Sequence, residues 1–563
     1  MTRLPAEVLK TAARGADVGG VISGVQRPGW RPRLLVVTVL VALLVGSSPV
    51  YATGHHGRAA HGGTHQAKKH LGKKRATHRK RPHRRPSTQG DTPSPAATAT
   101  AAAPVPSTQL APAVRCTSAV SPSGWLTTGD ATRRLDPLTA AELKPSTSRS
   151  AVHVAVDDTT RYQSMDGFGA ALTESSAHLL MQLKPAARTA ALRSLFDPVT
   201  GAGMDLVRLP LGSSDFALSR YTYDDLPAGQ TDPTLSRFTL AHDDAEIVPV
   251  LQEALQINPS LRVLGTPWSA PAWMKSNQSL LGGTLADGYT DVYAGYLVRT
   301  VQALRARQIP IRFLTLGNEP RYAPADYPGM LLSPQQEAAL AGAVAGRLAQ
   351  AGISDVQLIG YDHNWDDTSY ATSLLADPAA GSALAGTAFH CYAGDPSAQS
   401  TVHDTAPDKG IWFTECSGGS WSPEYAGNLG WDANTLLLGA TRSWARSVLL
   451  WNLALDPAGG PHTGGCGSCR GVLTIDPATG AVTRNVEYDV LGQAGKGVRP
   501  GAVRVATPES VYGVKTVAYV NPDGTHALTA YNSWQSDQTL VVDAGSRHVG
   551  APLPAGSVVT LVW

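Results

Sequence analysis

The chain has 563 residues, of which 42% are hydrophobic and 16% charged, and its formal net charge is +3. A chain of this length is not a single small domain; it has room for one large domain, a smaller one and tails. The charge is uneven, because residues 58–85 hold 11 Lys and Arg and no acid, which leaves 36 basic against 44 acidic residues elsewhere. The body of the protein is therefore mildly acidic.

Residues 1–52 contain the pattern of an export signal. Residues 34–45 are apolar apart from one Thr, Arg31 and Arg33 precede them, and a small-residue site that predicts cleavage after Ala52 follows. The apolar run is short for a membrane span, which needs about 20 residues; an uncleaved anchor is the alternative. We therefore predict a secreted protein, or one retained at the cell surface.

Residues 53–113 are predicted to be a linker. The segment is rich in His, Lys, Arg and Gly up to residue 86 and in Ser, Thr, Pro and Ala after it. Neither half has enough apolar residues to bury a core, so we predict a disordered tether. The basic half could bind an anionic cell-surface polymer, and a solvated spacer is the alternative. Nucleic acid is not predicted as a partner, because no aromatic residues alternate with the basic ones.

From about residue 114 apolar runs alternate with longer amphipathic segments, which is the pattern of a parallel β/α fold. Eight runs are predicted to be strands: residues 165–169, 205–211, 262–267, 312–316, 356–361, 387–392, 410–414 and 447–453. Helical segments such as residues 291–306 and 335–351 lie between them. Eight strands connected in this way predict a (β/α)8 TIM barrel over residues 161–488.

After residue 488 the pattern changes to short alternating runs separated by Gly, Pro and Asn turns, which predicts antiparallel strands. These runs are residues 502–505, 514–520, 526–531, 539–542 and 557–563. Residues 152–156 alternate in the same way, so residues 114–160 are expected to add strands to the sheet formed by residues 489–563. The predicted fold class is α/β, a TIM barrel with an appended, discontinuous antiparallel β-sandwich that supports the barrel or, alternatively, binds sugar.

Two of the predicted barrel strands end in a carboxylate. Glu319 follows the fourth run in the sequence Gly-Asn-Glu-Pro, and Glu415 ends the seventh run before a loop of small residues. The carboxyl ends of barrel strands converge, so both side chains are expected at one site, where poor solvation can raise the pKa of Glu319. A lone Glu there would be a helix cap, but a pair of carboxylates is what glycoside hydrolysis requires.

The motifs at the strand ends resemble those of glycoside hydrolase family 30, the glucosylceramidase-like retaining β-glycosidases. The similarity runs from about Tyr162 to the carboxyl terminus. The matching stretches are DGFGAALTE (166–174), VRLP with SDF (207–210 and 214–216), TPWSAP (266–271), GNEP (317–320), FHCY (389–392), TE (414–415) and WNLAL (451–455). Each stretch is weak alone, but seven in order, each at a predicted strand end, are a specific signal.

The resemblance implies roles for both glutamates, Glu319 as acid/base and Glu415 as nucleophile in a double displacement. It also implies that Arg208 lies beside Glu415 and keeps it ionised. The side chains implied to bind substrate are Asp215, Trp268, Asn318, Trp451, His390 and Tyr392. Asn318 is expected to bond the sugar 2-hydroxyl, a contact that strengthens in the transition state. Packing within the barrel mouth is the alternative for the pocket residues.

The cysteines are expected to be structural. In an exported protein Cys466 and Cys469 most simply form a small local disulfide, because zinc would need ligands beyond His462. Cys391 and Cys416 are expected to be buried packing thiols. The chemistry implies no metal and no organic cofactor, since two carboxyl groups suffice.

The sequence thus predicts a secreted retaining β-glycosidase that hydrolyses β-glucosidic bonds. The loops after the seventh and eighth strands resemble those of bacterial members rather than of animal lysosomal enzymes, so glucosylceramide and β-1,6-glucan both stay open as substrates. Endo or exo action and the oligomeric state are not predicted. The alternative is a noncatalytic carbohydrate-binding or wall-attached protein on the same fold, against which the two intact glutamates argue.

Overall fold

The computed structural model describes residues 121–563. The predicted export signal, the cleavage after Ala52 and the basic linker lie outside the described residues. In this described part of the chain, no helix is both long and apolar enough to cross a bilayer.

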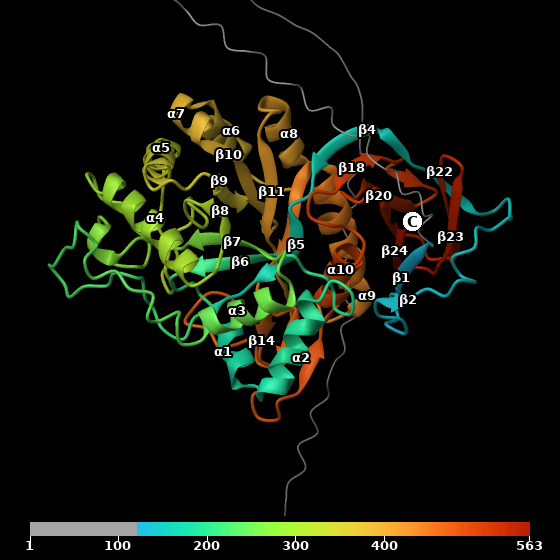
Figure 1. The fold of residues 1–563 in the computed structure, drawn as a ribbon, viewed down its shortest axis with the longest axis horizontal. Helices are drawn as coiled ribbons and strands as arrows, with labels where there is room; N and C mark the ends of the chain where they lie inside the picture. The colour runs from blue at the N-terminus through green and yellow to red at the C-terminus, as the bar shows by residue number, and fades with distance from the viewer. Residues whose placement is uncertain (1–120) are drawn as a thin grey trace, which may run out of the picture. The chain divides into compact units, whose positions relative to one another are not determined.

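Eight parallel strands close into a barrel, as predicted (Figure 1). They are β5 (Gly167–Ala171), β6 (Leu206–Leu211), β7 (Arg262–Pro267), β8 (Ile311–Thr315), β9 (Gln357–Asn364), β10 (Leu384–His390), β11 (Gly410–Glu415) and β13 (Ala445–Leu450). Each strand agrees with a predicted run to within about three residues at either end. The barrel closes where β13 pairs with β5, so Ser447 lies opposite Gly167.

The barrel interior is filled by apolar side chains, one from each of seven strands, as in other packed parallel barrels. They are Leu206, Leu264, Phe313, Ile359, Ala388, Trp412 and Leu449. The remaining strand, β5, has Gly169 where it meets β6. A Cβ at Gly169 would lie 1.8 Å from the carbonyl oxygen of Leu206, so the two strands approach too closely for any side chain there.

Helices connect the strands on the outside of the barrel. They are α1 (Glu174–Gln182), α2 (Pro185–Phe196), α3 (Ile247–Ile257), α4 (Thr290–Ala306), α5 (Pro334–Gln350), α6 (Thr368–Ala376), α7 (Pro378–Ala383), α8 (Ser397–Thr405), α9 (Tyr425–Trp431) and α10 (Val486–Gly495), with the short 3-10 turn η1 (Ala272–Met274) and the wider turns of η2 (Asp432–Ala440). The start of α5 is fixed locally: the side chains of Ser333 and Gln336 each accept a hydrogen bond from the other's backbone, and Pro334 follows the cap.

The second part is a β-sandwich whose strands come from both sides of the barrel sequence. One sheet runs β2 (Asp136–Pro137), β1 (Ser123–Thr127), β24 (Val558–Val562), β21 (His526–Asn532), β20 (Val514–Val520), β18 (Val503–Ala506) and β4 (Asp157–Ser164), with β19 (Ser510–Val511) beside β20. The other runs β23 (Arg547–Leu553), β22 (Gln538–Ala544) and β3 (Val152–Ala155). Pairing is antiparallel except between β22 and β3.

The sequence pattern missed β23 because Gly550 and Pro552 interrupt its alternation. Small sheets brace the loops above the barrel, β12 (Gly418–Gly419) with β15 (Cys469–Arg470), and β14 (Ala454–Leu455) with β16 (Leu473–Ile475) and β17 (Val482–Arg484).

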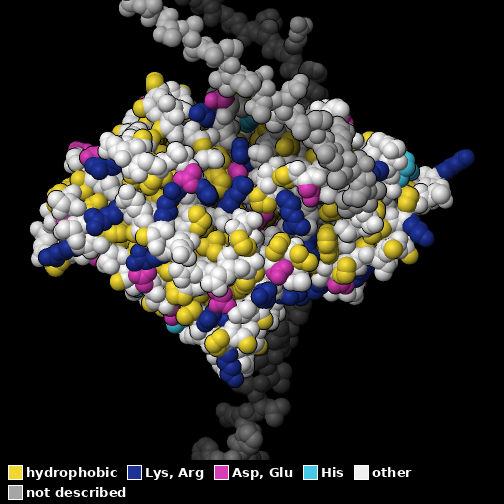
Figure 2. Space-filling view, in the orientation of Figure 1, with side chains coloured by type: hydrophobic (Ala, Val, Ile, Leu, Met, Phe, Trp, Pro, Cys, Tyr) yellow, Lys and Arg dark blue, Asp and Glu magenta, His cyan; other side chains and the backbone are white. Residues whose placement is uncertain are grey.

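Helix α10 joins the two parts. It contacts β5 of the barrel and β1 and β24 of the sandwich, and every one of its residues is buried. Its two acidic residues are paired, Glu487 with Arg470 at 2.7 Å and Asp489 with Arg134 at 2.7 Å. Such pairing is what allows carboxylates to be buried. On the face shown in Figure 2, basic and acidic side chains are interspersed.

Candidate active site

Glu319 stands in the loop that follows β8. Its backbone is bonded to the ends of both neighbouring strands, since Asn318 N donates to Pro267 O at 2.8 Å and Glu319 N donates to Asp362 O at 3.0 Å. Glu319 has φ +48°, a left-handed conformation that is costly for a residue with a side chain. Backbone strain of this kind persists where the surrounding structure fixes it, and it is concentrated at functional sites.

Glu415 is the last residue of β11 and is 6% exposed. Each carboxylate oxygen has its own donor: Arg208 Nη1 donates to Oε2, and Tyr392 Oη donates to Oε1 at 2.9 Å. One oxygen of Glu415, one of Glu319 and a ring nitrogen of His390 lie within 4.8 Å of one another. The two glutamates that the sequence analysis singled out therefore face each other at the carboxyl ends of the barrel strands.

Arg208 of β6 organises the floor of the site and is fully buried. Besides Glu415, its guanidinium donates to Asn318 Oδ1 at 2.8 Å and to Asp362 Oδ2 at 3.0 Å. A planar guanidinium suits this arrangement, because its donors reach several acceptors in fixed directions. The structure thus brings Arg208 and Asn318 to the pair of glutamates.

His390 links Glu319 to Asp362. Its Nδ1 lies 3.2 Å from Glu319 Oε1 and its Nε2 lies 3.0 Å from Asp362 Oδ1. Burial alone would lower the pKa of His390, but the carboxylates of Glu415, Asp362 and Glu319 outweigh it and raise that pKa to about 9. The ring is therefore an imidazolium at neutral pH.

The expected raised pKa of Glu319 is wrong. Burial does raise the pKa of Glu319, but the hydrogen bond and charge of His390, with smaller contributions from His363 and Arg208, bring it below its usual value. The sequence pattern showed that Glu319 would be poorly solvated but did not show the cation beside it.

The remaining predicted pocket residues gather on one side of the glutamates. The rings of Trp268 and Trp451 stack at 5.2 Å, and the Arg208 guanidinium lies 4.9 Å and 5.6 Å from them. Asp215 is 8% exposed. Burial, and then the nearby charge of Glu415, raise the pKa of Asp215 well above its usual range. Trp268 and Trp451 thus form an apolar wall, and Asp215 adds one buried carboxyl group whose pKa is raised.

Two features of the site were not predicted from the sequence. Asp362, two residues before the end of β9, is fully buried and bonded to Arg208, His390 and Thr414 Oγ1, the last at 2.6 Å. In the sequence it is a carboxylate directly after the predicted run 356–361, a signal like the one that identified the two glutamates. The second feature is a disulfide between Cys391 and Cys416. The prediction that these cysteines are packing thiols is wrong.

The predicted Cys466–Cys469 disulfide is present, and its loop closes one wall of the site. Thr463 N donates to Asp215 O at 2.8 Å, and Gly465 N donates to Asp326 Oδ2 at 3.0 Å. A Cβ at Gly465 would lie 2.6 Å from an oxygen of Asp215, so this glycine lets the loop pack directly against that carboxyl group.

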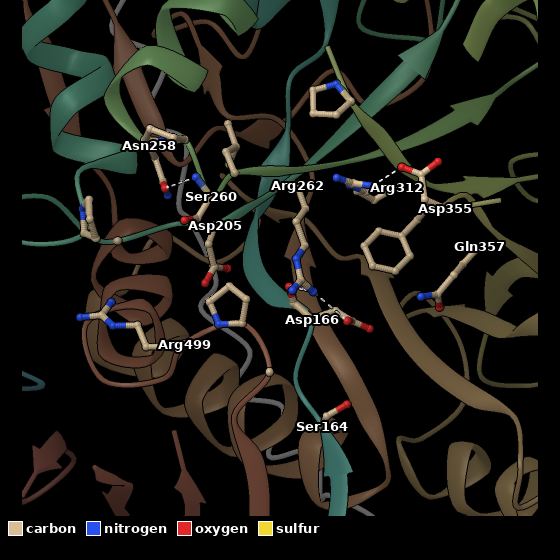
Figure 3. Close-up of a pocket in the computed structure, with 18 residues that line it drawn as sticks. Ser164, Asp166, Asp205, Asn258, Ser260, Arg262, Arg312, Asp355, Gln357 and Arg499 are labelled. Carbon is tan, nitrogen blue, oxygen red and sulfur yellow. Dashed lines mark hydrogen bonds and ion pairs between the residues drawn. The ribbon is translucent and has the colours of Figure 1, made fainter. Parts of the chain in front are cut away.

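A cavity of about 970 Å³ lies at the opposite end of the barrel, where the strands begin (Figure 3). Four of its charged groups form two ion pairs, Arg262 with Asp166 at 2.9 Å and Arg312 with Asp355. Size alone does not identify the reactive site, because the facing carboxylates lie at the other end of the barrel.

Comparisons with known proteins agree with this geometry. The glycosyl hydrolase family 30 TIM-barrel domain matches residues 165–465, and the family's β-sandwich domain matches residues 501–561. The chain is 34% identical to the endo-1,6-β-D-glucanase neg1 of Aspergillus fumigatus, over 74% of this chain and 88% of the relative. It is 32% identical to the endo-1,6-β-D-glucanase of Neurospora crassa, over 79% and 95%.

The lysosomal acid glucosylceramidase of Mus musculus is 26% identical, over 77% of this chain and 87% of the relative. Among solved structures, an endo-β1,6-glucanase superposes with a TM-score of 0.74 at 31% identity, over 79% of this chain and 99% of that one.

Proposed function

The chain belongs to glycoside hydrolase family 30 and is a retaining β-glycosidase, and from this we propose that it cleaves β-1,6-linked glucan internally, with Glu415 as nucleophile and Glu319 as acid/base. The observation that carries the catalytic assignment is that one oxygen of Glu319 and one oxygen of Glu415 lie within 4.8 Å of each other. Retaining enzymes hold their carboxyl groups about 5–5.5 Å apart, whereas inverting enzymes need roughly 6.5–9.5 Å to admit water between them.

In the first step a carboxylate oxygen of Glu415 attacks the anomeric carbon, and the leaving oxygen takes a proton from Glu319. Arg208 and Tyr392 hold Glu415 in place for this attack. In the second step Glu319 removes a proton from water, which attacks the anomeric carbon and releases the sugar from Glu415 with its original configuration.

The proton for the first step is shared between Glu319 and His390. At neutral pH it lies on the imidazole, whose Nδ1 is 3.2 Å from Glu319 Oε1. A bound sugar excludes water, which disfavours the charged pair and favours a neutral Glu319 beside a neutral ring. Glu319 then carries the proton that the leaving oxygen needs.

The stacked Trp268 and Trp451 suit the C–H faces of a sugar ring, and the carboxyl group of Asp215 can accept a hydrogen bond from a sugar hydroxyl. Asn318 uses its oxygen for Arg208, so its amide NH2 is left to donate to the sugar 2-hydroxyl. These four residues form the proposed binding site for the sugar unit whose bond is broken.

The substrate assignment is supported by the relatives. Those named as endo-1,6-β-D-glucanases are 32–34% identical, and the glucosylceramidase from mouse is 26% identical. The disulfide loop packs against Asp215, so we propose that it contributes to recognition of the substrate. We further propose export through residues 34–45 and retention at an anionic cell-surface polymer by the basic residues 58–85.

The test is hydrolysis by the full chain of a β-1,6-glucan and of glucosylceramide in detergent, with Glu319→Gln and Glu415→Gln as controls. We expect oligosaccharides from the glucan, β-configured new reducing ends by NMR, and no activity in Glu415→Gln. Glucose released from the lipid alone would overturn the glucanase proposal. A folded wild type that binds glucan and cleaves neither substrate would indicate a noncatalytic sugar-binding protein instead.

A further inference from the structure

A disulfide joins the two strand ends that hold the nucleophile and its tyrosine donor. Cys416 directly follows Glu415, and Cys391 stands between His390 and Tyr392, so a covalent bond links β10 to β11 within one residue of each group. The two cysteines are 25 residues apart in sequence, and Cys416 is 2% exposed. The bond therefore joins the residue next to Glu415 to the residue next to Tyr392.

The backbone pairing between β10 and β11 is irregular at this point. Residues up to Phe389, which lies opposite Phe413, keep a constant register, but it shifts between Phe389 and His390, so His390 lies opposite Glu415. Past the shift, Cys391 N donates to Glu415 O at 3.2 Å, and Trp451 N donates to Cys416 O at 2.8 Å. The disulfide thus cross-links the ends of β10 and β11, where the regular hydrogen-bond pattern between the two strands stops.

The two donors to Glu415 differ in how firmly they are held. Arg208 is fully buried and comes from a barrel strand, whereas Tyr392 lies in the loop after β10 and is 47% exposed. Apart from its bond to Glu415, the hydrogen bond that fixes Tyr392 runs from its N–H to Asn364 Oδ1 at 3.0 Å. The Tyr392 ring packs edge-on against His390, with 6.2 Å between the ring centroids, but nearly half of the residue is exposed. A covalent bond at the preceding residue therefore adds a constraint that this limited packing does not supply.

We propose that the Cys391–Cys416 disulfide is a positioning element for catalysis: it holds Tyr392 Oη against Oε1 of Glu415 and so fixes the direction from which Glu415 attacks. The proposal rests on the proposed role of Glu415 as nucleophile. A displacement of about 1 Å at a reacting group can lower the rate about 100-fold, so loss of the disulfide lowers kcat more than it changes KM.

The test is a set of three variants assayed with an activated aryl β-glucoside. Cys391→Ala with Cys416→Ala removes the bond, Tyr392→Phe removes the donor, and the third variant combines all three changes. We expect kcat to fall roughly 10- to 100-fold in each of the first two, with KM within about twofold. If the disulfide acts through Tyr392, the combined variant is no slower than the slower of the two. Losses that multiply, or an unchanged kcat without the disulfide, would overturn the proposal.

A matched control separates positioning from stability. Leu528→Ala removes a buried side chain in the sandwich core, away from the barrel, and lowers Tm without contact with the site. We expect it to keep the wild-type kcat. If it lowered kcat as much as loss of the disulfide at an equal fall in Tm, the effect would be one of stability and the proposal would fail.

Should the alanine pair not fold, reduction of the wild type replaces it. A dithiol supplies two electrons and two protons, leaves as its cyclic disulfide and converts the S–S bond into two thiols. We expect kcat to fall as mass spectrometry shows free thiols at positions 391 and 416, and not as it shows them at positions 466 and 469, and to return on reoxidation. Full activity with these thiols free would refute the proposal.

Covalent labelling tests the assignment of Glu415 as nucleophile independently of the disulfide variants. If a 2-fluoro glucoside does not label Glu415 in the wild type, the nucleophile is misassigned whatever the disulfide variants show. If it labels Glu415 and the losses multiply, the assignment stands and the positioning role does not.

Discussion

Replacing Asp362 by Asn tests whether one buried carboxylate organises the site. Asp362 Oδ2 accepts from Arg208 and Oδ1 from His390 and Thr414, so both oxygens face donors. Arg208, followed by His390, holds the pKa of Asp362 far below its usual range despite burial. An amide has the same shape, but its NH2 must face at least one of these donors, and it has no charge with which to balance Arg208.

The expected loss has two parts. Breaking one partner out of a buried ion pair costs about 3–5 kcal/mol. With an unfolding entropy of about 2.1 cal/mol/K per residue over roughly 440 residues, this lowers Tm by roughly 3–5 °C. We also expect kcat/KM to fall at least about 100-fold, because Arg208 and His390 each contact a catalytic glutamate.

The substitution is also expected to change the pH dependence of stability. The pKa of His390, about 9 against 6.5 in the unfolded chain, favours its charged form in the native state by about 3 kcal/mol. Because the folded pKa is the higher one, this stabilisation is complete below about pH 6.5 and is lost as pH rises through about 9. Without the Asp362 carboxylate the folded-state pKa of His390 falls, so this stabilisation is smaller and its loss is complete at a lower pH.

The assays are thermal unfolding and kcat/KM on a β-1,6-glucan between pH 5 and 10. Asp355→Asn is the matched control, since Asp355 is 43% exposed and pairs with Arg305 on the surface, where such pairs contribute about 1 kcal/mol or less. An Asp362→Asn protein with the Tm, activity and pH profile of the control would refute the reasoning.

Three further predictions follow from single contacts. Arg208→Lys leaves one ammonium where a guanidinium reaches Glu415, Asn318 and Asp362, so kcat falls roughly 100-fold in steady-state assays; activity within a few fold of wild type would contradict this. Trp451→Ala removes the ring stacked on Trp268. The lost stacking energy of about 1.5 kcal/mol is expected to lower kcat/KM roughly 10-fold; unchanged binding of a glucan oligosaccharide by calorimetry would contradict the proposed stacking. Lys275→Met loses bonds from Nζ to Ser269 Oγ, Leu280 O and Gly329 O, and each buried carbonyl left unpaired costs about 1–3 kcal/mol. Limited proteolysis should then cut within residues 276–289 or 321–333, and an unchanged digest would count against this clamp.

The sequence by itself determined the elements and the two glutamates, because the signals for them are local. An apolar run that stops at a polar loop shows a buried strand wherever it lies, and β5 to β13 matched such runs. Glu319 and Glu415 could be paired in advance because strands of a parallel barrel end on one side. Asp362 carried the same signal, but nothing in the sequence ranked it above other strand-end residues. Strand β23 was missed because its Gly and Pro hide the alternation.

Only the tertiary structure decided which groups touch. The direction of the Glu319 pKa depends on a cation 71 residues away, since the charge of His390 acts through space and outweighs burial. The Cys391–Cys416 bond depends on two strand ends that bring their Cα atoms to 5.3 Å, a distance that sequence spacing does not contain. The sequence specifies which side chains are present, but the distances created by folding determine which of them interact electrostatically or form a covalent bond.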